Sequence, residues 1–404
     1  MPGARGSWGD TELRGHPVWS SGFRPFFLAA ATYGPLLLGL WYGARSGWWP
    51  LPAASYALPL LHAHELLFGF AAALVCGVLL TALPSWSGAG ELRGAPLAAL
   101  AALWFAGRVG IHAAAWIPTV LVIVLDCVLL PALIGMLFLT IAAARRRLFW
   151  WTLPPLVALA AANLLFHLAL EGGSVTRAEW ALRLGVHALA FLFTLYGGLF
   201  IPAFTRRWLQ QRGEPAGAIL MPLEYATALA MIALAWTDLS GLRGGTMAGV
   251  ALVAAGVHAW RFARWRGWRT LSEPLLWCVH LGYAWLIAAL LLRALAELAP
   301  GFPNDAWVHA FTLGAYGMLK IGLMTRVALR HTGRPLQVGF VMRVAFVAML
   351  VAALLRLAYS VHDLGPGVLA ASALAWAAAL LAYLFIHGPM LFTASLPRPR
   401  KEEK

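Results

Sequence analysis

Apolar runs of about 20 residues recur along the whole chain, and each is long enough to cross a bilayer as a helix. The sequence is 61% hydrophobic and only 11% charged, which excludes a soluble globular protein. The polar stretches between the runs are too short to form a separate soluble domain. We therefore predict an all-α integral membrane protein with a polar N-terminal segment at 1–22, one membrane domain at 23–396 and a charged tail at 397–404.

The hydropathy pattern predicts twelve transmembrane helices. Their ranges are 26–43, 57–83, 95–116, 118–142, 150–170, 180–203, 219–239, 246–263, 274–297, 306–329, 340–361 and 367–392. Arginine-rich loops, such as Arg145-Arg146-Arg147, alternate with loops that carry little charge, which supports this count. Because positive loops stay in the cytoplasm, we expect both termini to be cytoplasmic. The same loops explain the net charge of +14, so we expect a lipid bilayer as partner and no nucleic acid.

The most unusual polar residues of the chain stand in the second predicted span, at His62-Ala63-His64-Glu65. Imidazole and carboxylate groups are costly in hydrocarbon, so such groups usually have a partner or a function. At about 100° per residue, His62 and His64 face different sides of one helix, whereas Glu65 shares the face of His62. One helix can therefore serve two separate sites.

Three histidines recur at nearly equal intervals. His64, His187 and His309 are 123 and 122 residues apart, near the outer ends of the second, sixth and tenth predicted spans. Val-His-Ala surrounds both His187 and His309. The spacing suggests three four-helix pseudo-repeats, and chance similarity in a low-complexity apolar sequence is the competing explanation.

Imidazole is the usual protein ligand of haem iron and also binds copper. The residues His62, His64, His187 and His309 share one predicted depth on three helices, so we predict them as metal ligands. For any single histidine in a membrane span, the alternative is a hydrogen bond to a neighbouring helix. His167 follows Asn163 by four residues and shares its face, so this pair is either a ligand with its support or an interhelical hydrogen-bond pair.

Other candidates lie on the predicted cytoplasmic side or along the tenth span. His280 and His331 lie toward the cytoplasm, where His331 is either a cofactor contact or a solvated loop residue. His309 and Lys320 are eleven residues apart, so they share nearly the same helix face with Tyr316 between them. This stripe could line a proton or ligand path, with snorkelling as the alternative for Lys320.

Charged residues in neighbouring spans and missing motifs narrow the options further. Arg108 and Asp126 lie on adjacent spans and are predicted to pair. The sequence has no Walker loop, no dinucleotide-binding glycine turn, no Cys-x-x-Cys-His attachment motif and no nucleophile elbow. Any haem is therefore expected to be held non-covalently.

With these residues assembled, the chain resembles the NnrS family. The similarity covers nearly the entire sequence and is carried by Phe23-Arg24-Pro25-Phe26-Phe27, His62-Ala63-His64-Glu65 with the following Leu67-Phe68-Gly69-Phe70, Leu79–Pro84, Trp104–Arg108, Asn163–His167, Ile201–Arg206, His280–Trp285, His309-Ala310 with Gly314, and His331-Thr332-Gly333-Arg334-Pro335-Leu336. The resemblance implies a polytopic protein of the bacterial inner membrane that binds haem b and copper. It also implies a role in denitrification and resistance to nitric oxide, with Arg334 beside His331 as a cofactor contact.

Three positions depart from the family pattern. Leu199 follows Gly197-Gly198 where the family usually has an arginine, Arg330 stands where it usually has a glycine, and Lys320 is not expected from it. By analogy of layout alone, the chain is similar to the main subunit of haem-copper oxidases, which has twelve spans in three groups of four. That subunit has a His-His pair on its seventh span, which this chain lacks, so it is not an ordinary member.

From these features we expect a haem–copper membrane protein, similar to nitric oxide reductases, that reduces nitric oxide to nitrous oxide. The expected centre lies in the outer half of the membrane and combines His62, His64, His187 and His309, with His167 close by and with Glu65, Tyr316 and Lys320 handling protons. The expected electron donor is a quinol or a small redox protein. The alternatives are a non-catalytic haem or copper transporter or chaperone, and a quinol-linked electron-transfer cytochrome.

Overall fold

The computed structural model describes residues 15–49, 56–88, 90–142, 147–362 and 364–397, and every regular element in those ranges is a helix. The first 14 residues, Arg145, Arg146 and most of the predicted tail lie outside the described residues. Helices cover all twelve ranges predicted from hydropathy, and ten of them are long and apolar enough to cross a membrane. The chain is therefore a multi-pass helical membrane protein. Twelve spans remain a prediction, because the ranges 219–239 and 306–329 are not among the ten.

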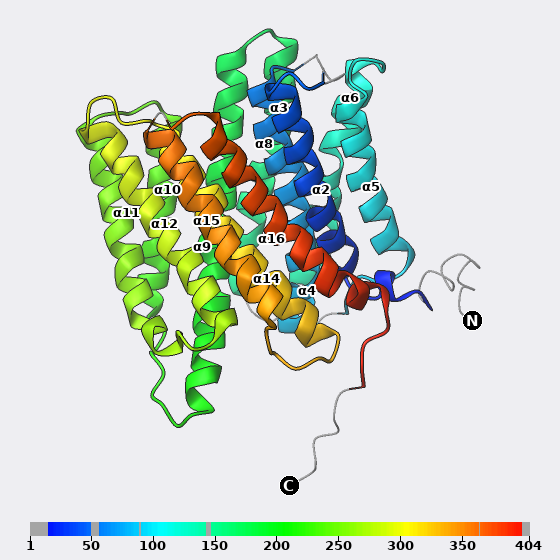
Figure 1. Ribbon diagram of the computed structural model, residues 1–404, viewed down its shortest axis with the longest axis vertical. Coiled ribbons are helices and arrows are strands. Elements are labelled where there is room, and N and C mark those ends of the chain that lie inside the picture. Colours follow the sequence, from blue (N-terminus) through cyan, green and yellow to red (C-terminus); the bar gives the residue numbers. More distant parts are fainter. Residues whose placement is uncertain (1–14, 50–55, 89, 143–146, 363, 398–404) are drawn as a thin grey trace. The chain divides into compact units, whose positions relative to one another are not determined.

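The helices form two compact units. Unit 1 comprises residues 1–160, 324–337 and 380–404. Its helices (Figure 1) include α2 (Phe23–Arg45), α3 (Leu58–His64), η2 (Glu65–Ala71), α4 (Ala72–Ser87), α5 (Ala95–His112), α6 (Thr119–Cys127) and α7 (Leu129–Ala142), with the short 3₁₀ turns η1 (Pro17–Ser20) and η3 (Arg147–Thr152). Helix α2 packs on α4, and α5 packs on α6 and α7. The second predicted span is thus one continuous rod built from α3, η2 and α4.

Unit 2 comprises residues 161–323 and 338–379. It contains α9 (Val175–Gln210), α10 (Met221–Leu239), α11 (Gly245–Arg264), η4 (Gly267–Thr270), α12 (Pro274–Leu298), α13 (Ala306–His309), η5 (Ala310–Gly317) and α15 (Phe340–Val361). Helices α10, α11 and α12 lie side by side (Figure 1). The helices α8 (Leu153–Glu171), α14 (Met318–His331) and α16 (Pro366–Phe392) contribute residues to both units.

Two segments depart from α-helical geometry at corresponding places. The π-helix η2 begins directly after His64, and the π-helix η5 begins directly after His309. Such i→i+5 turns are rare and occur frequently at functional sites. At His187, in contrast, α9 is an uninterrupted α-helix of 36 residues. The second and tenth predicted spans are therefore locally alike, while the three-fold pseudo-repeat stays a prediction.

The second span is the most enclosed helix of unit 1. Of its most apolar window, 89% is buried inside the protein, whereas the corresponding value for α15 in unit 2 is 33%. Backbone and side-chain polar groups in such a position have neither water nor lipid headgroups as partners. The polar residues of the span must therefore find their partners on other helices.

The Phe-Arg-Pro-Phe-Phe stretch has a structural role in unit 1. Arg24 is fully buried and donates hydrogen bonds to the carbonyl oxygens of Met390 (3.3 Å), Leu391 (2.8 Å) and Thr393 (2.7 Å) and to Ser395 Oγ (2.9 Å). The last carbonyl groups of a helix lack intrahelical donors, so this guanidinium caps the C-terminal end of α16. Arg24 thereby ties the first long helix to the last.

Candidate functional site

A buried polar network surrounds the start of η2 in unit 1. The Glu65 carboxylate is fully buried and accepts a hydrogen bond from Tyr33 on α2 at Oε2 and from Arg108 on α5 at Oε1. The ring atom Nδ1 of His64 lies 2.9 Å from Glu65 Oε1. Sequence reasoning expected Glu65 to share the face of His62; the structure instead pairs the carboxylate with His64, whose ring it helps to fix.

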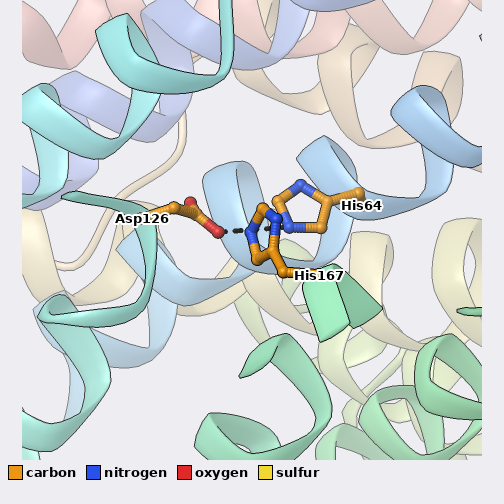
Figure 2. Close-up of side chains that lie close together, drawn as sticks. All are labelled: His64, Asp126 and His167. Atoms are coloured by element: carbon orange, nitrogen blue, oxygen red, sulfur yellow. Dashed lines mark ion pairs between the residues drawn. The ribbon is translucent and has the colours of Figure 1, made fainter. Parts of the chain in front are cut away.

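The other ring nitrogen of His64 faces a second carboxylate. His64 Nε2 lies 3.2 Å from Asp126 Oδ2, an ion pair marked by a dashed line in Figure 2. Arg108 donates to Asp126 Oδ1 as well as to Glu65, so the predicted pairing of Arg108 with Asp126 is confirmed. His167, the third residue labelled in Figure 2, belongs to unit 2, where it is buried beside Phe166.

The charges of this network restrict the state of His64. Two carboxylates face one guanidinium, and each nitrogen of the imidazole faces one of the carboxylates. Both nitrogens can donate only when the ring is an imidazolium, whereas a neutral ring must direct one lone pair at a carboxylate. A metal cation at Nε2 would replace that proton, with Glu65 holding Nδ1–H. This is the carboxylate–histidine arrangement that commonly orients a metal-ligating imidazole.

Gly69, in the Leu67-Phe68-Gly69-Phe70 stretch, allows the network to form. A Cβ at Gly69 would lie 2.8 Å from Cε1 of the Tyr33 ring and 3.0 Å from Arg108 Nη1. The indole of Trp104 also donates to the Gly69 carbonyl oxygen at 2.9 Å. The absence of a side chain within the π-helix therefore lets Tyr33 and Arg108 reach Glu65.

A groove opens beside this network. It has a volume of about 820 Å³ and runs along α2 and α5, and most of its lining is apolar. Tyr33, Arg108 and His112 form its polar part, where Tyr33 Oη lies 3.0 Å from His112 Nε2. The groove thus reaches the Glu65 carboxylate through the Tyr33 hydroxyl.

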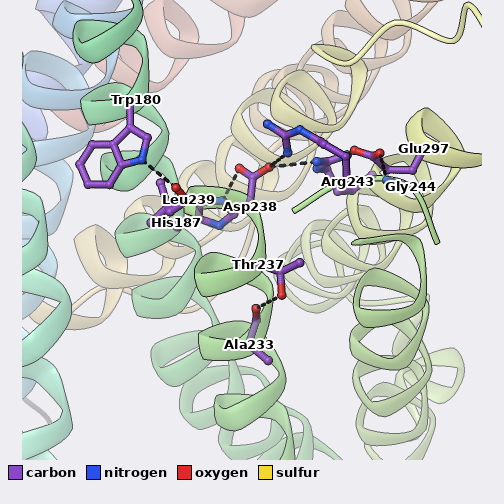
Figure 3. Close-up of polar contacts among 10 residues, drawn as sticks. Trp180, His187, Ala233, Thr237, Asp238, Leu239, Arg243, Gly244 and Glu297 are labelled. Carbon is purple, nitrogen blue, oxygen red and sulfur yellow. Dashed lines mark hydrogen bonds and ion pairs between the residues drawn. The ribbon is translucent and has the colours of Figure 1, made fainter. Parts of the chain in front are cut away.

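In unit 2, His187 is held by a different carboxylate (Figure 3). His187 Nε2 lies 2.9 Å from Asp238 Oδ2 at the end of α10, and its ring stacks on Trp307 at 5.4 Å. Asp238 Oδ1 also accepts from Arg243 (2.7 Å) and Arg293 (2.9 Å). The opposite ring atom, His187 Nδ1, is buried and has no hydrogen-bond partner within the part of the chain that the structure describes.

The remaining predicted metal ligands have other surroundings. His309 Nε2 accepts a hydrogen bond from Arg356. The same nitrogen lies 3.5 Å from Asp305 Oδ2. His62 is half-buried in unit 1 and packs on the Trp41 ring, with ring centroids 4.3 Å apart. His62 and His64 therefore contact different helices, as their facing predicts. The structure places His187 and His309 in unit 2 and His62 and His64 in unit 1.

The predicted cytoplasmic-side histidines make structural contacts. His280 Nδ1 lies 2.9 Å from the Leu276 carbonyl oxygen of its own helix, and its Nε2 lies 3.3 Å from Thr205 Oγ1 on α9. This is the interhelical hydrogen bond that was the alternative for a single membrane histidine. The His331 ring packs near Phe23, with centroids 5.6 Å apart, and Arg334 donates to the Thr332 carbonyl oxygen at 3.5 Å.

The predicted stripe on the tenth span needs a correction. Lys320 is buried, and its Nζ lies 4.9 Å from the centroid of the Tyr316 ring, so these two residues are neighbours. However, the π-helix η5 lies between His309 and Lys320. Counting at the α-helical angle does not apply across it, so the expected common face with His309 is not supported.

Sequence reasoning missed several members of these networks. Tyr33 and His112 belong to the Glu65 network of unit 1, and Asp238 holds His187 in unit 2. A second polar cluster in unit 2 was also missed. There Arg261 donates to Glu224, to the Thr194 carbonyl oxygen (3.0 Å) and to Tyr283 Oη (3.1 Å). A tyrosine in the middle of an apolar run and an acidic residue at its end were the only available signals.

Comparison with known proteins identifies one family. The sequence model described as NnrS protein matches residues 17–395, which is nearly the whole chain. A search of the curated proteins found no match.

Proposed function

Because this chain belongs to the NnrS family, we propose that it is a haem- and copper-binding protein of the bacterial inner membrane that reduces nitric oxide to nitrous oxide. The observation that carries the proposal is the His64 ring, which is held between two carboxylates inside a membrane-spanning helix. An imidazole with one nitrogen fixed by a carboxylate is prepared to bind a metal through the other.

The donor chemistry of both units fits a bound metal. In unit 1, His64 would bind through Nε2 with Glu65 orienting Nδ1–H, and Asp126 would add an oxygen donor or balance the charge. In unit 2, His187 would bind through its buried Nδ1, because Asp238 already holds Nε2. Imidazole suits both iron and copper. We also propose His62, His167 and His309 as further ligands. One or two copies of haem b would be bound non-covalently.

The reaction needs protons at a buried site. Two molecules of nitric oxide, two protons and two electrons give one nitrous oxide and one water. The bound haem and copper would supply the electrons. Tyr33 donates to Glu65, and Glu65 contacts His64, so these side chains form a continuous hydrogen-bonded route from the groove to the proposed ligand. Glu65 is therefore the proposed proton donor, with Tyr316 and Lys320 as further proton-handling residues in unit 2. The centre is proposed to lie in the outer half of the membrane, with both termini cytoplasmic.

Purified protein tests the proposal directly. We expect haem and copper in defined ratios to protein, and consumption of nitric oxide with an artificial reductant accompanied by nitrous oxide release. The reduced absorption spectrum should contain a high-spin haem component that changes when nitric oxide is added. Stable haem without nitric oxide turnover would contradict the enzymatic proposal and favour a transporter, a chaperone or an electron-transfer cytochrome.

A further inference from the structure

The groove of unit 1 is accessible from the lipid-facing surface. It lies along α2 and α5, which are both apolar enough to span a membrane. Leu36, Phe105 and Trp116 line it and are more than half exposed. Its volume of about 820 Å³ is in the range of small-molecule sites. Because these exposed side chains are apolar, an occupant would enter from the hydrocarbon phase rather than from water.

One region of this groove offers a hydrogen-bond acceptor. Tyr33 donates its proton to Glu65, so its oxygen accepts from His112 Nε2–H. This tautomer leaves a lone pair on His112 Nδ1. Arg108 also lines the groove, but its Nε–H is buried and therefore closed to an occupant. Its two terminal nitrogens are already committed to Glu65 and Asp126.

We propose that this groove is a binding site for a membrane quinol, whose head group hydrogen-bonds to His112. A quinol has a ring with two opposed oxygens and a long apolar tail. One hydroxyl can donate to His112 Nδ1. The apolar remainder of the groove matches the tail.

The depth of the polar residues distinguishes a quinol from a phospholipid. His112 is the last residue of α5, but its Nε2 lies 3.0 Å from the hydroxyl of Tyr33, which stands near the middle of the 23-residue α2, about 15 Å from its start at 1.5 Å per residue. The charged phosphate of a lipid lies at the membrane surface, outside a hydrocarbon core about 30 Å thick. A quinol head group carries no net charge and can enter the hydrocarbon.

The groove also provides an exit for the protons of the quinol. Oxidation breaks two O–H bonds and releases two protons and two electrons, leaving the quinone. Both protons leave in turn through His112 Nδ1, with His112 Nε2–H donating to Tyr33 and Tyr33 to Glu65, and both are consumed where nitric oxide is reduced. The two electrons pass to the metal centre proposed above and reduce nitric oxide. The inference therefore rests on the proposed function for its electron acceptor, but quinol binding does not depend on turnover.

Binding is measured on the full-length protein in lipid nanodiscs. A photoreactive azidoquinone should label peptides from 18–36 or 101–116, and an excess of decylubiquinone should suppress the labelling. His112→Phe removes the acceptor but retains a flat ring, and we expect roughly tenfold weaker quinone binding. Ala29→Phe fills the groove one turn before Tyr33 and should abolish labelling. The matched control is Ala378→Phe on the exposed face of α16, which should label like the unaltered protein.

The outcomes separate this inference from the proposed function. Labelling elsewhere, or labelling unaffected by Ala29→Phe, would overturn the quinol site, as would a phospholipid that decylubiquinone cannot displace. If nitric oxide is then still reduced with an artificial donor, the proposed function survives alone. Conversely, competed labelling in α2 and α5 without nitric oxide turnover supports the quinol site and contradicts the enzymatic proposal.

Discussion

Arg108 on α5 donates a hydrogen bond to Asp126 on α6 beside a close backbone contact at Gly107. A Cβ at the neighbouring Gly107 would lie 3.2 Å from Asp126 Cα and 3.1 Å from the Leu125 carbonyl oxygen. Small residues at such contacts let membrane helices pack backbone to backbone. The ion pair therefore lies in a close helix–helix contact, so replacing either of its partners should destabilise the protein.

Replacing Arg108 with methionine should destabilise the protein strongly. Glu65 and Asp126 would remain buried without their shared cation, and breaking a buried ion pair costs about 3–5 kcal/mol. Thermal unfolding in detergent would measure the loss. Adding Glu65→Gln and Asp126→Asn to Arg108→Met should recover part of it. The control Arg93→Met breaks an exposed pair with Glu91 and should change stability by less than about 1 kcal/mol. Equal effects of the two arginine variants would contradict this account.

Alanine at Gly69 should be damaging even though alanine favours helix. The added Cβ would press on the Tyr33 ring, which is fixed by Glu65 and His112, so we expect a loss of about 1–3 kcal/mol. Gly39 on α2 has nothing within 4 Å of its Cβ position. Gly39→Ala is therefore the matched control and should be neutral or slightly stabilising. Paired melting curves would compare them, and a neutral Gly69→Ala would show that the network adjusts more easily than its contacts indicate.

Removal of the His64 imidazole should empty the metal site of unit 1. We expect His64→Ala to lower the bound metal per protein, and Asp126→Asn, which keeps the shape of the side chain, to weaken metal affinity by roughly 10- to 100-fold. Elemental analysis and the reduced absorption spectrum would report the loss. His362→Ala, an exposed histidine at the end of α15, is the control. Unchanged haem and copper in His64→Ala would refute the assignment.

The Arg24 contacts predict a change at the far end of the chain. Arg24→Gln cannot reach the set of carbonyl oxygens at 390–393 with comparable charge, so the end of α16 should open more often. Hydrogen exchange of residues 388–396 should rise, and a protease should cleave there sooner. The exposed Arg45, whose guanidinium lies over Trp41, provides Arg45→Gln as a control. If residues 388–396 stay as protected from hydrogen exchange and protease in Arg24→Gln as in the unaltered protein, other contacts hold this end of α16.

Hydropathy predicted the helices well because a bilayer selects length and apolarity, which are properties of a local stretch. The range 340–361 was predicted to the residue, and most others to within a few. Arg108 and Asp126 could be paired because buried charges on adjacent helices have few other partners. The link between His187 and Asp238 was not predictable, because Asp238 stands at a helix end, where a charge needs no buried partner.

The two π-helices were also beyond sequence reasoning. Apart from Glu65, their residues, 65–71 and 310–317, do not differ in kind from those of an ordinary apolar α-helix, so hydropathy gives no sign of the wider turn. This is why the stripe from His309 to Lys320 was counted at the wrong angle. It also explains why Tyr33 and Arg108 could not be assigned to Glu65 before the direction of its side chain was known.

The π-helix at 65–71 takes up about one residue more than an α-helix would need for the same turn of the chain. If the same residues formed an ordinary α-helix, the part that precedes them would be turned by about 100° around the helix axis relative to α4 and pushed out by about 1.5 Å. The imidazole of His64 would then point away from Asp126. The direction of this histidine therefore depends on a local backbone geometry that many apolar substitutions in the same stretch would leave unmarked in the hydropathy.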